Sequence, residues 1–186
     1  MPFFTNGMNT KPIIIGAVVV VVIAVILGMT FKGSGASSDA YRGATYTIEG
    51  KQVTLVDGVA ETEAAPGSAS KVVTKIFGNE VKTDFNEDGR GDVAFIMTQE
   101  AGGSGTFYYL VGAIKNAEGQ TEPYWGMQAV LLGDRIAPQT TEYKNKEIIV
   151  NFATRNPGED FSVQPSLNVS KTFQFVEGSL VQAPLR

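Results

Sequence analysis

The longest apolar run of the chain lies near its N-terminus. Residues 12–31 read PIIIGAVVVVVIAVILGMTF, carry no charge, and are bracketed by Lys11 and Lys32. At about 1.5 Å of rise per residue, a helix of this length extends roughly 30 Å, the thickness of a bilayer's hydrocarbon core. The pattern predicts one uncleaved transmembrane helix over residues 12–31, preceded by a short N-terminal segment, residues 1–11.

Two other interpretations of the apolar run remain open. The apolar region of a cleaved signal peptide spans about 7 to 15 residues and is followed closely by small residues at the cleavage site. The best such site, Ser38-Asp39-Ala40, lies well beyond the run, which favours the anchor. A buried core helix is the third interpretation.

A short segment rich in Gly, Ser and Ala follows the apolar run. Residues 32–44 read KGSGASSDAYRGA, a composition that buries too little apolar surface to fold by itself. We expect these residues to form a flexible linker. The folded domain is then predicted to span residues 45–186.

The rest of the chain shows the pattern of a mainly β domain. Residues 45–61 contain two runs rich in β-branched residues, with turns at Gly50-Lys51 and Asp57-Gly58. A closing pair of strands is expected about Glu177-Gly178 within residues 171–182. Further strands are predicted within residues 71–78, 92–99, 105–114, 124–133 and 147–154.

Several of these runs are continuously apolar instead of alternating, which indicates strands that are buried on both faces. The predicted fold is a small antiparallel sheet, barrel-like or two-layered. A short helix within residues 64–77 is an alternative, and would make the domain α+β. No repeat with a period of 20 to 50 residues is present, so neither a propeller nor a solenoid is expected.

Composition excludes several kinds of site. The chain contains neither cysteine nor histidine, which removes Cys/His zinc sites, disulfides, lipoprotein anchoring through cysteine and Ser-His-Asp triads. The net charge is -4, and no concentrated basic face is visible. A nucleic-acid partner is therefore not expected.

The densest run of carboxylates lies between two predicted strands. Residues 84–92 read DFNEDGRGD, with side-chain oxygens at alternate positions and a glycine that allows a sharp turn. Calcium takes six to eight oxygen ligands, which such a curled backbone can direct at one point. The sequence predicts a calcium site whose ligands are Asp84, Asn86, Asp88, the backbone carbonyl of Arg90, and Asp92.

The first half of this loop matches an EF-hand or dockerin loop, whereas Phe95 occupies the twelfth position, where an EF-hand has glutamate. The acid at the ninth position runs directly into a predicted strand, and the loop resembles the calcium loops of FG-GAP and VCBS-type domains of extracellular proteins. This resemblance implies the same five ligands. It covers about twelve residues and does not extend to the propeller fold, because the loop occurs once.

A second resemblance covers most of residues 45–182. The stretches YTIEGKQVTLVDGVAE, APGSASKVVTKIFGNE, GGSGTFYYLVGA, LLGDRIAPQTTE and FVEGSLV are similar to uncharacterised bacterial proteins with one N-terminal span and one small extracytoplasmic domain. That group implies location and domain boundaries, but no activity. The distribution of positive charge does not decide the orientation of the predicted span in the membrane, since Lys11 precedes it and Lys32 and Arg42 follow it. A calcium site of modest affinity favours an extracytoplasmic C-terminal domain.

These features predict a single-pass, membrane-anchored extracytoplasmic protein that acts without catalysis. It would bind a protein or cell-wall glycan partner or join a cell-surface assembly, and exposed aromatics at Phe107–Tyr109 and Tyr124-Trp125 are one candidate platform. Ala24 and Gly28 form a small-residue pair that could support a homo-oligomer. Two alternatives stay open: a pilin-like filament subunit, and a hydrolase using paired carboxylates such as Glu100 and Asp134.

Overall fold

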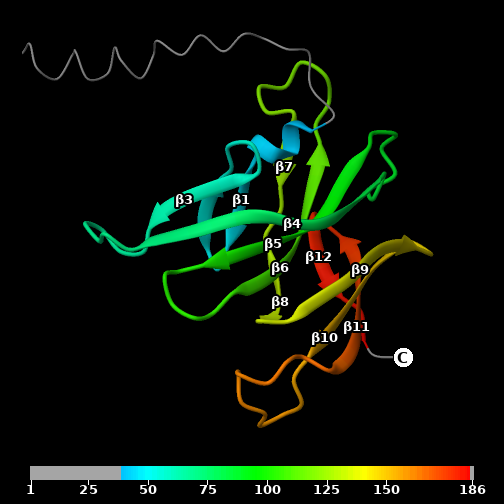
Figure 1. Cartoon of the computed structure of the whole chain (residues 1–186). Coiled ribbons are helices and arrows are strands. Elements are labelled where there is room, and N and C mark those ends of the chain that lie inside the picture. Colours follow the sequence, from blue (N-terminus) through cyan, green and yellow to red (C-terminus); the bar gives the residue numbers. More distant parts are fainter. Residues whose placement is uncertain (1–38, 185–186) are drawn as a thin grey trace, which may run out of the picture. The chain divides into compact units, whose positions relative to one another are not determined.

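The computed structural model describes residues 39–184 (Figure 1). The predicted N-terminal segment, the predicted transmembrane helix of residues 12–31 and residues 32–38 of the predicted linker lie outside the described residues. Within residues 39–184, no helix has both the length and the apolar character needed to cross a bilayer.

The described part of the chain is mainly β. One short 3-10 helix, η1 (Ala40–Gly43), precedes the strands, and no α-helix occurs among residues 39–184. The strands are β1 (Thr45–Ile48), β2 (Lys51–Thr54), β3 (Val59–Glu63), β4 (Lys71–Thr83), β5 (Asp92–Glu100), β6 (Phe107–Lys115), β7 (Tyr124–Gly126), β8 (Val130–Asp134), β9 (Ala137–Lys144), β10 (Glu147–Thr154), β11 (Leu167–Val176) and β12 (Ser179–Gln182).

The strands form three antiparallel sheets. The hairpin sheet consists of β1 and β2, and the C-terminal sheet has the order β12-β11-β10-β9. The central sheet has the order β3-β4-β5-β6-β7, and β8 also pairs with β6, beyond the stretch that pairs with β7. One contact extends the central sheet, because Thr47 of β1 forms a parallel bridge with Gln128.

Tight two-residue turns connect many neighbouring strands. Three of them pair an acidic residue with glycine, both at positive φ: Glu49-Gly50, Asp57-Gly58 and Glu177-Gly178. The turn between β9 and β10 uses Asn145 and Lys146, also at positive φ. Such turns match the right-handed twist of paired strands. The predicted turns at residues 50–51, 57–58 and 177–178 are confirmed to within one residue.

The sheets pack as three layers, with the central sheet in the middle. Along β5, Val93, Phe95 and Met97 belong to the core shared with the hairpin sheet, which we call the hairpin-side core. The intervening Ala94 and Ile96 belong to the core shared with the C-terminal sheet, the C-terminal-side core. Residues Val93–Met97 are thus buried on alternate faces, which explains why this run is continuously apolar.

Glycine permits the closest approach between the hairpin sheet and the central sheet. A Cβ built on Gly126 would lie 2.2 Å from the carbonyl oxygen of Thr45. A Cβ on Gly112 of β6 would lie 2.4 Å from the sulfur of Met127 on the other face. A larger residue at position 126 would push β1 away from β7, whereas one at position 112 would displace the Met127 side chain within the C-terminal-side core.

The structure differs from the sequence-based expectation at four places. Residues 40–43, expected as linker, form η1 and place Tyr41 in the hairpin-side core with 0% exposure. The short helix within residues 64–77 is wrong, since β4 begins at Lys71. Strand β9 was not predicted, because APQTTEYK is polar and mostly exposed. The layers number three, because both faces of the central sheet are covered.

Candidate metal site in the Asp84–Asp92 loop

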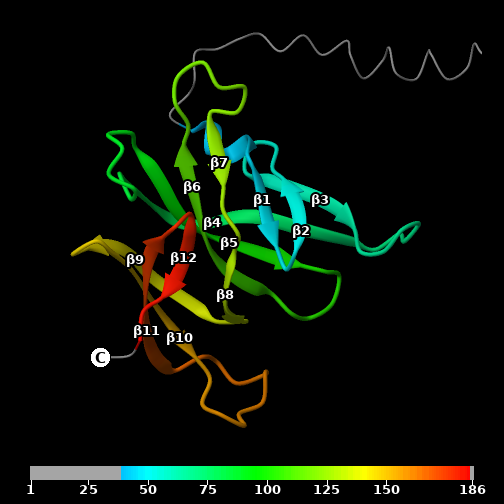
Figure 2. The same cartoon turned by 180° about the vertical axis from the view of Figure 1, so that it is seen from behind.

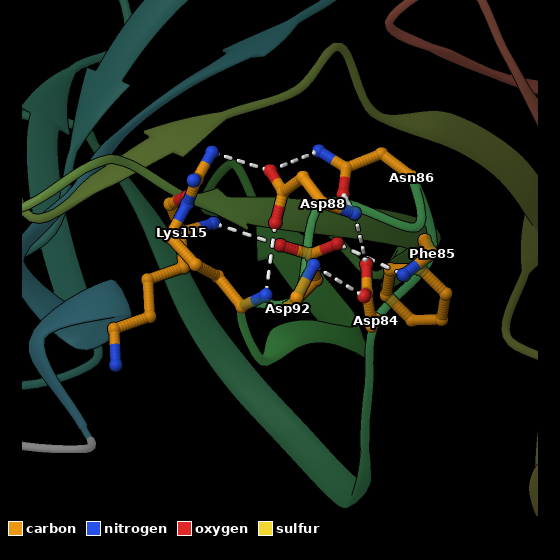
Figure 3. Close-up of polar contacts among 8 residues, drawn as sticks. Asp84, Phe85, Asn86, Asp88, Asp92 and Lys115 are labelled. Carbon is orange, nitrogen blue, oxygen red and sulfur yellow. Dashed lines mark hydrogen bonds and ion pairs between the residues drawn. The ribbon is translucent and has the colours of Figure 1, made fainter.

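The acidic loop joins β4 to β5 and lies against the end of β6 (Figure 3). Glu87 and Gly89 adopt positive φ within it, which lets the backbone curl as the D-x-N-x-D-G pattern predicts. Figure 3 shows the side chains of Asp84, Asn86, Asp88 and Asp92 close together, each bonded to neighbouring groups of the loop or of the adjoining strand ends. Four of the five predicted calcium ligands therefore contribute oxygens to one small region.

The first three of these side chains hold the curl of the loop. Asp84 accepts hydrogen bonds from the N–H groups of Asp88, at 3.1 Å, and Gly89, at 2.7 Å. The amide oxygen of Asn86 also accepts from Asp88 N–H at 3.1 Å. Asp88 accepts from the N–H of Arg90 at 2.9 Å and from the Asn86 amide at 2.8 Å. These bonds preorganise the loop.

Asp92 is the buried member of the group. Its exposure is 0%, and its two oxygens accept the N–H groups of Phe85 and Lys115, each at 2.9 Å. Among the described residues it forms no ion pair with a basic side chain. Burial raises the pKa of the Asp92 carboxyl, and the nearby charges of Asp88 and Asp84 act in the same direction. A cation in the loop would relieve both effects.

Arg90 supplies positive charge to one side of the loop. Its guanidinium pairs with Asp88 at 2.5 Å and donates from Nε to the carbonyl of Lys115 at 2.9 Å. This arrangement fastens the loop to the end of β6. It also neutralises one of the three aspartates without a metal, so Arg90 is the internal competitor for the cation.

The donor chemistry of the loop fits calcium. A carboxylate has about four lone-pair positions, so oxygens that accept one N–H each keep capacity for a metal. In the part of the chain that the structure describes, however, no group of three or more Asp or Glu side chains is placed to hold a metal ion. The ligand set Asp84, Asn86, Asp88, Arg90 and Asp92, which includes an amide and a backbone carbonyl, stays a prediction.

Phe85 connects the loop to the C-terminal-side core. Its side chain is 8% exposed and meets the ring of Tyr143 edge-on, with centroids 5.4 Å apart. Beside it, Glu87 pairs with Lys146 at the tip of the β9–β10 hairpin. A hollow of about 280 Å³ lies between them, lined also by Ile148 and Phe175. No sequence motif marks Phe85 or Lys115 as a supporting residue, because their roles depend on backbone amides and long-range contacts.

The aromatic stretches do not form one platform. Tyr109 and Tyr124 are buried in the hairpin-side core. Phe107 and Trp125 are 38% and 48% exposed, but the strand register directs them to opposite faces. Phe107 shares the face of Tyr109, whereas Trp125 lies opposite Ile114 of the C-terminal-side core.

Glu100 and Asp134, the candidate hydrolase pair, each have a partner of their own. Glu100 pairs with Lys75 at 3.4 Å. Asp134 pairs with Arg135 at 2.7 Å and accepts the N–H of Thr106 at 3.1 Å. Gln99 and Asp134 both lie opposite Phe107, so alternation turns Glu100 to the other face. The fold does not bring these two carboxyl groups together on one face.

Comparison of the chain with protein-family models, curated proteins and solved structures gives no match. The site is therefore interpreted from its own chemistry.

Proposed function

We propose that the chain is a membrane-anchored extracytoplasmic protein whose β domain binds a protein or glycan partner at the cell surface without catalysis. A calcium ion would hold its Asp84–Asp92 loop in a fixed shape. The observation that supports this best is the fully buried carboxylate of Asp92, which lies beside two further aspartates and, within residues 39–184, pairs with no basic side chain.

Calcium suits this loop better than magnesium. The five predicted ligands combine carboxylate, amide and carbonyl oxygens on a curled backbone, a mixture that the flexible coordination of calcium accepts. Magnesium requires a near-ideal octahedron and gives up its water reluctantly. Bound calcium would offset the mutual repulsion of Asp84, Asp88 and Asp92, and so would fasten β4 to the start of β5.

The position relative to the membrane follows from the same proposal. A site of modest calcium affinity is filled where calcium is millimolar, outside the cytoplasm. Residues 12–31 would then act as the single span and the residues before η1 as the tether. The β domain would be displayed at the surface, where it meets its partner.

The direct test is calorimetric titration of calcium chloride into the full chain in detergent micelles, after removal of metal with EDTA. We expect saturable binding to one site, and we expect Asp84→Asn or Asp88→Asn to remove it. Asp57→Asn, in an exposed turn remote from the loop in sequence, is the matched control. Absence of saturable heat, or equal loss with Asp57→Asn, would exclude the calcium site.

A further inference from the structure

A groove separates the end of the central sheet from the C-terminal sheet. Its volume is about 360 Å³, and its walls are residues 128–131 on one side and Ser179 and Leu180 of β12 on the other. Figures 1 and 2 both show β12 beside the stretch that contains β7 and β8. At one end the walls meet, since the ring of Trp125 lies 3.3 Å from the position of a Cβ on Gly178.

The walls of this groove include two open strand edges, whereas Gln128 and Ala129, just before β8, are already paired with Thr47 of β1. In the described part of the chain, β8 pairs only with β6, and β12 pairs only with β11. Each strand therefore has one edge without a strand partner. Proteins usually protect such edges with charged residues or proline, but the lining residues here are uncharged: Gln128, Ala129, Val130, Leu131, Ser179 and Leu180.

Apolar side chains border the two edges. Leu131, which lines the groove, is 47% exposed, and Trp125 is 48% exposed at the closed end. Leu180 is 6% exposed and belongs to the C-terminal-side core. Exposed apolar residues that gather along an unpaired edge mark a surface for a partner.

A positive charge lies beside β8 at Leu132, the residue that follows the groove-lining Leu131. The ammonium of Lys171 donates to the carbonyl of Leu132 at 3.1 Å and lies 5.6 Å from the centre of the Phe152 ring. Within residues 39–184 it forms no ion pair with a carboxylate. Burial lowers the pKa of Lys171. A carboxylate brought to this position would supply the missing anion.

We propose that the groove receives an extended segment of a partner protein as an added strand, with apolar side chains toward Leu180 and a carboxylate beside Lys171. An extended strand is the backbone form that offers hydrogen bonds along both edges. It would lie between β8 and β12 and join the two sheets. This inference names a binding surface within the proposed function, but it does not depend on calcium.

The test adds the strand to the full chain itself. A Gly/Ser linker and the segment Thr-Val-Thr-Val-Asp are fused after Arg186, and a second fusion carries Asp-Val-Thr-Val-Thr to allow the opposite direction. Fusion raises the effective concentration into the millimolar range. Trp125 is the only tryptophan, so its emission reports on the groove. We expect one fusion to shift this emission to the blue, to protect the amides of β8 and β12 from exchange, and to raise Tm by about 3 °C.

Three controls make the result decisive. Replacing the central Thr of the fused segment with Pro removes a backbone donor and should abolish every effect. Replacing its Asp with Lys should weaken the effect, and Lys171→Gln should erase this Asp-over-Lys preference while Lys171→Arg keeps it. Leu131→Asp, at an exposed position, should block insertion without unfolding the chain.

The proposal is overturned if the Pro fusion behaves like the others, if neither fusion alters the emission of Trp125, or if the unfused chain fills the groove by dimerising. Calcium binding should be unchanged in all of these fusions and variants. Failure of the groove proposal therefore leaves the calcium-site proposal standing, and the reverse also holds.

Discussion

The N–H of Lys115, the last residue of β6, donates to Oδ1 of Asp92, the first residue of β5, at 2.9 Å. The other oxygen of Asp92 accepts the N–H of Phe85 at 2.9 Å, so one buried carboxylate joins the acidic loop to two central strands. The state of the loop is thereby coupled to the stability of the central sheet.

Calcium should raise the melting temperature of the full chain in detergent in a concentration-dependent manner, because a ligand that binds the folded state stabilises it. Magnesium should do so much less. Asp88→Ala should remove most of the calcium-dependent increase. Glu87→Ala is the matched control and should keep this increase, since solvent screens the exposed Glu87–Lys146 pair. Scanning calorimetry with and without EDTA measures the difference, and identical curves would contradict the site.

Protease added to intact cells or spheroplasts should remove the domain from η1 onward if residues 12–31 form an uncleaved anchor. Mass analysis should then recover a fragment that begins at Met1. Extraction should require detergent, whereas a shed filament would pellet without it. A mature N-terminus near Tyr41 would indicate signal cleavage instead.

Tyr41→Ala should destabilise the domain by about 3–5 kcal/mol, the usual cost of deleting a buried aromatic side chain. The ring of Tyr41 is 0% exposed and lies 5.5 Å from the Phe95 ring and 5.8 Å from the Tyr124 ring, between centroids. Val56→Ala, at a side chain that is 78% exposed, is the control and should change little. Urea unfolding measures both. A negligible effect of Tyr41→Ala would mean that residues before β1 do not belong to the folded unit.

Gly126→Ala should cost about 3 kcal/mol or more, as overpacking of a rigid contact does. The added Cβ would lie 2.2 Å from the Thr45 carbonyl oxygen, and backbone atoms yield poorly. Gly43→Ala is the matched control, because a Cβ there meets no atom within 4 Å. Equal stability of the two variants would contradict the close packing of β1 on β7.

Alkaline pH should destabilise the domain. Burial raises the pKa of Tyr46 above its ordinary value of 10.0, and burial followed by the hydrogen bond to Glu49 does the same for Tyr109. A raised folded-state pKa means that stability is fully present below pH 10 and falls as pH rises above it, because the unfolded tyrosines release their protons first. Tyr46→Phe removes its bond to the Tyr41 carbonyl, 2.6 Å, and lowers the starting stability. Tyr46→Phe should also reduce the decrease in folding stability between pH 9 and pH 11, which denaturant unfolding at each pH would detect.

Local sequence signals identify most strands, because β-branched runs and acid-glycine turns act over short distances. They identify the acidic loop because its predicted ligands all lie within nine residues of one another. They miss β9, where Pro138 and polar side chains suit an outer strand. They also miss Tyr41, because the segment around it is rich in Gly and Ser and has the composition of a linker. Its ring nevertheless packs in the hairpin-side core. The arrangement of the three sheets in layers depends on which distant strands pair and which sheets pack together. No local sequence pattern carries that information.

The sharing of β5 and β6 between both cores has a consequence for how the domain unfolds. An opening that exposes one core also frees the reverse side of the same two strands, so neither core can melt alone. We expect a single cooperative transition, with the amides of β5 and β6 exchanging only through global unfolding. Fragments cut between the central and C-terminal sheets would then lack half the partners of these strands and would not fold as independent modules.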